Sequence, residues 1–189
     1  MIRWFHCLLI ASFIASPLSA QAPVASYLFP AGGQRGTDVP VRIGGLFLHN
    51  KAQLDWQAKG LKVENVLKPI NSVWFEGPLL PIPESQRSED YPFDMQSRFT
   101  ISKDAPLGES RGRIWTSQGV TTPLRFVVSE LPEVLEHEID GDPIPQAVSL
   151  PVTANGRIFP REEIDLWEFK AKKGATVTAF LNAASFGSP

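Results

Sequence analysis

Residues 112–128, GRIWTSQGVTTPLRFVV, contain the pattern on which the interpretation of the fold rests. Two alternating runs, Gly112–Thr116 and Thr121–Val128, flank the turn residues Ser117-Gln118-Gly119. Alternation with a period of two places successive side chains on opposite faces of a strand, and a short glycine-containing connection is typical of a β-hairpin. The stretch therefore predicts an antiparallel hairpin. The expected inward residues are Leu124, Phe126 and Val128, and the expected outward residues are Arg125 and Val127.

Similar runs lie upstream and extend the β pattern over residues 21–129. Strands are expected at Ser26–Phe29, Val39–Ile43, Leu61–Leu67 and Arg98–Ser102. Proline donates no ladder hydrogen bond, so Pro40 places the second of these strands at a sheet edge. The nearest helix candidate, Lys51–Lys59, is short and polar, and no convincing amphipathic helix follows residue 22. The Pro-rich residues 77–92 are expected to form a surface loop, which we interpret as mobile rather than functional.

A second β-rich region follows an acidic linker at residues 130–143 and occupies residues 144–189. Strands are expected at Val148–Val152, Leu166–Phe169 and Thr176–Leu181. The chain stops at Gly187-Ser188-Pro189, one turn after the last of them. We expect this second domain to be incomplete and the chain to be the N-terminal piece of a longer protein. In isolation, residues 133–189 are expected to be poorly ordered, because a hydrophobic face and an open edge lack cover.

The N-terminus predicts export. Residues 1–20 combine a short basic start with an apolar run, Cys7–Ile14, and end in small residues at Ala20. This arrangement is typical of a secretory signal peptide. Cys7 is the one cysteine, so the mature chain has no thiol or disulfide. No second long apolar stretch follows, and we expect no transmembrane segment after the signal. The formal net charge of −2 gives no electrostatic footprint for nucleic acid.

Turn and strand motifs at both ends of residues 22–129 fit one known pattern. They are Pro30-Ala31-Gly32-Gly33-Gln34-Arg35-Gly36-Thr37, Val39-x-Val41-x-Ile43-x-Gly45, Ala105-Pro106-Leu107-Gly108 and Ser117-Gln118-Gly119-Val120. The region resembles an immunoglobulin-like IPT/TIG domain. The resemblance implies a β-sandwich that serves as an interaction or spacer module, with no catalytic residues.

Motifs in residues 133–189 point to a second family. They are Glu136-x-Glu138-x-Asp140-x-Asp142-Pro143, Val152-x-x-Asn155-Gly156-Arg157-Ile158 and Asp165-Leu166-Trp167-x-Phe169-x-Ala171-x-x-Gly174. This part resembles the first portion of the bacterial pre-peptidase C-terminal (PPC) domain. The resemblance implies a β-sandwich appended to a secreted peptidase.

The acidic run is the one candidate metal site. Alternating acids in an extended segment place carboxylates on one side of the chain, and Ca²⁺ takes oxygen ligands. Some relatives of the PPC domain bind calcium with a comparable segment, which stiffens the linker. By resemblance, the candidate ligands are Glu136, Glu138, Asp140, Asp142 and Asp165. A solvated acidic linker without metal is the alternative, and apart from this calcium no cofactor is expected.

Catalytic patterns are absent from the sequence. His49 lies in a polar turn and His137 in the acidic linker, and neither accompanies a G-x-S-x-G elbow or an H-E-x-x-H pair. We interpret both as exposed loop histidines. For most of the aromatic residues Trp115, Trp167, Phe169 and Phe180, core packing is a better explanation than a carbohydrate-stacking platform.

Together these features predict an all-β protein with two antiparallel β-sandwich domains, Ig-like or jelly-roll-like, the second incomplete. The expected function is a secreted, non-enzymatic binding or spacer module of a larger exported bacterial protein. Its expected partners are downstream domains of the same protein, and extracellular protein or polysaccharide. Its expected location is secreted, periplasmic or at the cell surface. The alternative is the accessory region of a secreted peptidase or other hydrolase whose catalytic domain lies beyond residue 189.

Overall fold

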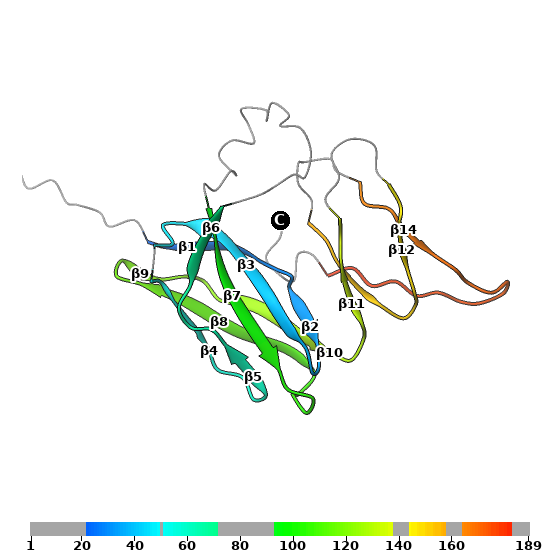
Figure 1. The fold of residues 1–189 in the computed structure, drawn as a ribbon, viewed down its shortest axis with the longest axis horizontal. Helices are drawn as coiled ribbons and strands as arrows, with labels where there is room; N and C mark the ends of the chain where they lie inside the picture. Colours follow the sequence, from blue (N-terminus) through cyan, green and yellow to red (C-terminus); the bar gives the residue numbers. More distant parts are fainter. Residues whose placement is uncertain (1–21, 50, 72–92, 138–143, 158–163, 183–189) are drawn as a thin grey trace, which may run out of the picture.

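The computed structural model describes residues 22–49, 51–71, 93–137, 144–157 and 164–182. All regular elements in these ranges are β-strands, and in the first region two five-stranded sheets pack against each other (Figure 1). The predicted all-β sandwich fold is confirmed. No helix in these ranges is long and apolar enough to cross a membrane. The predicted signal peptide and Pro-rich loop lie outside the described residues.

The first sheet has the order β1-β3-β7-β5, and all its pairs are antiparallel. A fifth strand, β6, pairs with the other end of β7. The strands are β1 (Val24–Phe29), β3 (Asp38–Leu46), β5 (Leu61–Val63), β6 (Lys68–Asn71) and β7 (Phe93–Ile101).

The second sheet has the order β2-β10-β8-β4, with β9 also on β8. The predicted hairpin is confirmed, since β8 and β10 pair antiparallel with Leu124 opposite Gly112. Leu124, Phe126 and Val128 are all buried, as expected. The strands are β2 (Gly32–Gln34), β4 (Gln53–Trp56), β8 (Gly108–Thr116), β9 (Gly119–Val120) and β10 (Leu124–Ser129).

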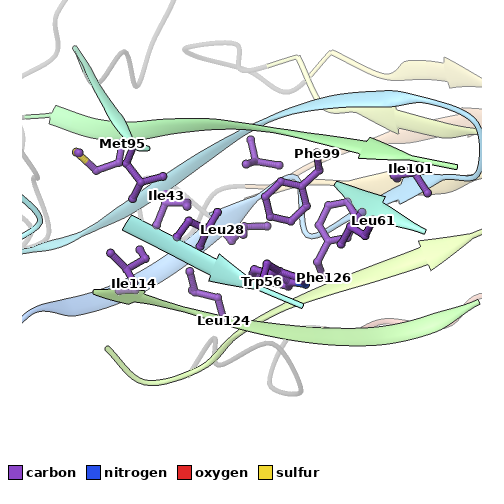
Figure 2. Packing of buried hydrophobic residues seen from close by; sticks show 14 of the residues in the cluster. Leu28, Ile43, Trp56, Leu61, Met95, Phe99, Ile101, Ile114, Leu124 and Phe126 are labelled. Carbon is purple, nitrogen blue, oxygen red and sulfur yellow. The ribbon is translucent and has the colours of Figure 1, made fainter. Parts of the chain in front are cut away.

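Three aromatic rings fill the centre of the space between the sheets (Figure 2). The ring centroids of Phe99 and Phe126 are 4.7 Å apart, and Trp56 meets Phe99 edge-on at 5.0 Å. Such offset and edge-to-face pairs add to the free energy that burial of the rings already provides. The indole Nε1 of Trp56 donates a hydrogen bond to Ser110 Oγ at 2.9 Å, so its polar atom is satisfied inside the core.

Two strand predictions in the first region are wrong. The strand with Pro40 pairs with both β1 and β7, so it does not lie at an edge. The β1 pairing, however, extends no further along it than Phe29 opposite Arg42. Pro40 therefore has no β1 neighbour to which it would have to donate. The strand expected at Leu61–Leu67 ends at Val63, after which the chain crosses to the second sheet. There Asn65 O accepts a hydrogen bond from Leu54 N at 2.7 Å.

The nearest helix candidate, Lys51–Lys59, contains a strand instead of a helix. Residues 53–56 form strand β4, with Leu54 and Trp56 buried and Gln53 and Asp55 exposed. Buried and exposed side chains alternate with a period of two, as in a strand with one face on the core. The segment forms the edge strand of the second sheet.

The second region contains two pairs of short parallel strands, so the antiparallel pairing predicted for it is wrong. They join β11 (Glu133–Leu135) to β13 (Thr153–Asn155), and β12 (Gln146–Val148) to β14 (Trp167–Phe169). The strand predicted at Thr176–Leu181 is wrong: the segment is extended, but no described strand pairs with it. Phe180 and Leu181 are 89% and 92% exposed, because no second sheet covers them in the described part of the chain.

The core-packing interpretation of the aromatic residues is wrong for three of the four. Trp115 is 51% exposed, Phe169 43% and Phe180 89%, whereas Trp167 is partly buried. On β8 the neighbouring Ile114 points into the core, which turns Trp115 toward solvent.

Candidate functional site

The most deeply buried charge in the described residues lies on the outer face of the first sheet. Asp94 of β7 is fully buried, and its Oδ1 accepts a hydrogen bond from the hydroxyl of Tyr27 at 2.6 Å. Its Oδ2 accepts one from Arg42 Nε at 2.9 Å and lies 2.6 Å from a terminal nitrogen of the same guanidinium. These three side chains from β1, β3 and β7 form one network, which we call the Asp94 network.

A glycine makes the Asp94 network geometrically possible. Tyr27 lies opposite Gly44 of β3, and a Cβ added at Gly44 would fall 1.9 Å from Tyr27 Cε1. The phenol ring therefore lies across the backbone of β3, where any side chain would block it. This places the Tyr27 hydroxyl within reach of Asp94 on the next strand.

The environment of Tyr27 determines its chemistry. Burial raises the pKa of its phenol far above the usual range, and the hydrogen bond to Asp94 and the charge of that carboxylate raise it further. Arg157 and Arg42 lower it by a smaller amount. A phenol with a raised pKa stays protonated, so it donates a hydrogen bond and does not act as a base or nucleophile. The arrangement stabilises a buried carboxylate.

Arg157 of the second region reaches this face of the first sheet. Its guanidinium lies over the ring of Phe29, 4.8 Å from the centroid, a cation–π contact. The backbone N–H of Arg157 donates to the carboxylate of Glu136, which comes directly after strand β11. Arg157 thus joins the second region to the outer side of β1.

A second set of contacts joins the two regions beside strand β2. Glu133 accepts hydrogen bonds from Ser129 Oγ at 3.0 Å and from Asn155 Nδ2 at 2.8 Å. The amide oxygen of Asn155 accepts one in turn from the backbone N–H of Ala31 at 3.3 Å. Burial raises the pKa of the Glu133 carboxyl, and the hydrogen bonds from Asn155 and Ser129 partly counter this. We call Glu133, Asn155 and Arg157 the inter-unit clamp.

The structure places two of the predicted calcium ligands together. A Cβ built on Gly156 would lie 2.5 Å from Glu136 Oε2 and 3.7 Å from Asp165 Oδ2, so the two carboxylates converge on this glycine. Glu138, Asp140 and Asp142 lie outside the described residues. Within the described ranges, no three His, Cys, Asp or Glu side chains form a group able to hold a metal ion. Of the five predicted ligands, Glu136 and Asp165 are therefore the two that lie in the described residues.

The two histidines of the predicted mature chain lie apart from both sets of contacts. His49 is exposed, and its Nε2 lies 3.1 Å from Gln118 Oε1. His137 is exposed, and its backbone N–H donates to Gln146 Oε1 at 3.0 Å. Neither is hydrogen-bonded to a nucleophile or a carboxylate in the described residues, as a catalytic histidine requires.

Sequence reasoning missed the Asp94 network and the inter-unit clamp. The expected strand began at Arg98, so Asp94 was not recognised as a strand residue. A signal was present, since Asp94 lies between Phe93 and Met95 at the start of a run that forms strand β7. A charged residue there implies a partner if the strand is buried on both faces.

The comparisons with known proteins give little further guidance. No family model matches the chain, and no curated protein matches it. Among solved structures, one chain in a crystal structure of a complex between a CaDoc0917 variant and CaCohA2 is similar. Its sequence identity is 9%, its TM-score is 0.30, and the match covers 57% of the present chain and 99% of the other. A similarity this distant carries no argument about function.

Proposed function

We propose that the chain is a secreted, non-catalytic β-sandwich module that binds or spaces other parts of a larger exported bacterial protein. The observation that carries the proposal is that the buried polar groups in the described residues bond strands and structural units to each other. Asp94, the one charged residue there that is fully buried, is held by Tyr27 and Arg42, and the adjacent Arg157 connects two structural units. These groups hold strands together.

The raised pKa of Tyr27 supports the same proposal. Perturbed groups often mark catalytic sites when the shift produces a base or a nucleophile near neutral pH. Here the shift moves the phenol pKa further from neutrality, because burial and the Asp94 carboxylate both oppose ionisation. A group shifted in this direction strengthens a structural hydrogen bond.

The inter-unit clamp supports a spacer role. Glu133 and Asn155 tie β11 and β13 to β10 and to the residue before β2, and Arg157 adds a contact to β1. Three separate contacts resist bending more than one linker does. The proposed module would therefore hold the downstream domains at a fixed orientation, and calcium bound at Glu136 and Asp165 would add to this.

Turnover assays with the purified chain test the proposal. We expect no release of product from casein, from nitrophenyl esters or from nitrophenyl glycosides above the rate in buffer. A mock purification from cells that lack the gene controls for contaminating activity. Turnover by the wild-type chain above that of the mock preparation would refute a non-catalytic role.

The alternative is an accessory region of a secreted peptidase or other hydrolase. It differs from the first proposal in requiring a catalytic domain in the same protein. A downstream domain with a Ser-His-Asp arrangement or an H-E-x-x-H pair supports the alternative, and further β repeats support the binding or spacer module.

A further inference from the structure

One row of side chains on strand β8 points away from the sandwich core. Glu109, Arg111, Arg113 and Trp115 occupy alternate positions and are exposed, whereas Ile114 between the last two is fully buried. At about 3.4 Å per residue, the row extends over roughly 20 Å. It runs along β8 of the second sheet, where β10 lies on one side of its first half and β4 on the other side of its second half (Figure 1).

Neighbouring strands widen the row into a flat strip. Arg125 of β10 lies opposite Arg111, and Asp55 of β4 lies opposite Arg113. β10 pairs with the Gly108–Gly112 part of β8 and β4 with the Gly112–Trp115 part, so each flanks a different half of the row. With adjacent strands about 4.8 Å apart, the surface that β8 shares with either strand is roughly 10 Å wide. We call this surface the Trp115 strip.

Several residues of the Trp115 strip act against folding stability. Trp115 leaves 51% of its surface in water. Arg111 and Arg125 are directly opposite each other, and like charges in that position destabilise a sheet. The carboxylate of Glu109 forms an ion pair with both: Oε1 lies 2.6 Å from Arg111 Nε, and Oε2 lies 3.6 Å from a terminal nitrogen of Arg125. Local choices that oppose the fold are expected at functional sites.

The positive charge of Arg113 is available to bind a ligand. Asp55 lies opposite it in the ladder, but the Asp55 carboxylate accepts a hydrogen bond from Gln57 at 3.2 Å. Among the described residues, no carboxylate lies within ion-pair distance of Arg113, so its guanidinium is available beside the exposed indole of Trp115.

Charge and size select the kind of partner. The chain carries a formal net charge of −2, yet the strip presents three arginines against two acids, so an anionic ligand is favoured there. A standard protein interface needs about 800 Å² on each partner, whereas a strip of these dimensions offers roughly 200 Å². A narrow, extended polymer fits it better than a folded protein does. Nucleic-acid-binding domains are usually strongly basic, which this chain is not.

We propose that the Trp115 strip binds an acidic polysaccharide lying along strand β8. A sugar ring packs on the indole of Trp115, and carboxylates of the polymer form charge-assisted hydrogen bonds with Arg113 and its neighbours. This inference rests on the proposed function as a binding module and names the ligand class of that module.

Affinity electrophoresis of the whole chain tests the proposal. The wild-type chain is run through gels that contain polygalacturonate, a polyuronate, or the neutral polymer dextran. Trp115→Ala and Arg113→Gln are compared with Arg98→Gln, which removes an exposed arginine from the outer face of the other sheet. Circular dichroism verifies that each variant keeps the β-fold.

We expect polygalacturonate to retard the wild-type chain and dextran to leave it unaffected. Trp115→Ala and Arg113→Gln should each weaken retardation at least about tenfold, which corresponds to the loss of one contact of roughly 1.4 kcal/mol. Arg98→Gln should change it less than about twofold, and added salt should weaken it because the arginines are exposed. Absence of retardation, or equal retardation of Trp115→Ala, overturns the proposal.

Two further results separate this inference from the proposed function. Tighter binding of a thymidine oligonucleotide than of polygalacturonate replaces the polysaccharide with nucleic acid and overturns the inference. New reducing ends released from polygalacturonate refute the non-catalytic role, while loss of retardation in Trp115→Ala still supports the strip as the binding site.

Discussion

Replacement of Asp94 by alanine should be among the most destabilising single changes in the first sandwich. The carboxylate is fully buried and holds both the Tyr27 hydroxyl and the Arg42 guanidinium. Asp94→Ala leaves the phenol without this acceptor and the guanidinium without its counter-charge. An uncompensated buried charge is costly because the protein interior solvates it poorly.

The magnitude is set by the two lost interactions. Breaking a buried ion pair by removal of one partner costs about 3–5 kcal/mol. The side chain of Arg42 is 26% exposed, so water partly solvates its charge and favours the lower half of that range. Tyr27→Phe removes one hydrogen bond to a charged acceptor and should cost about 1.5–3 kcal/mol. We expect about 3–4 kcal/mol for Asp94→Ala.

Urea unfolding followed by circular dichroism measures both values. The matched control is Asp38→Ala, which removes an exposed carboxylate from the adjacent strand, where it accepts a hydrogen bond from Thr100. Loss of such a surface contact should cost less than about 1 kcal/mol. A cost for Asp94→Ala no larger than that of the control would refute the reasoning. If Asp94→Ala does not fold, a Tyr27→Phe variant with wild-type stability would refute it equally.

Three further predictions concern other parts of the structure. Burial raises the Glu133 pKa above the ordinary value of 4.5, so the stability contributed by its protonated form is complete below that pH and is lost as pH rises through the raised value. Glu133→Gln should therefore gain stability relative to wild type between pH 4 and pH 7 in urea titrations, and a constant difference would contradict this. Gly112→Ala should lower the free energy of unfolding by about 2 kcal/mol, because overpacking strains a filled core. The added Cβ would lie 2.1 Å from Trp56 Cε3 and 2.7 Å from the carbonyl oxygen of Asp55. Thermal or urea unfolding measures the change, and a neutral effect would show that the indole can move. For calcium, a bound ion predicts that millimolar Ca²⁺ raises the melting temperature and that Asp165→Asn removes the shift, whereas a solvated linker predicts no shift in either chain.

The sequence alone determined the elements whose evidence is local. Alternation and a turn within residues 112–128 predicted the β8–β10 hairpin, and the inward residues Leu124, Phe126 and Val128 are buried as expected. Side-chain period and turn chemistry act between residues close in sequence, so a single strand pair can be read without knowledge of the rest.

The tertiary structure decided which strands are neighbours and which face of each is covered. Tyr27 and Asp94 are 67 residues apart in sequence and meet because β3 lies between their strands. At Ile114 and Trp115 both faces of the strand carry apolar side chains, so alternation alone cannot tell which one is buried. The opposing sheet covers Ile114 and leaves Trp115 in water. Contacts between residues distant in sequence depend on how the sheets pack, and no local pattern records that packing.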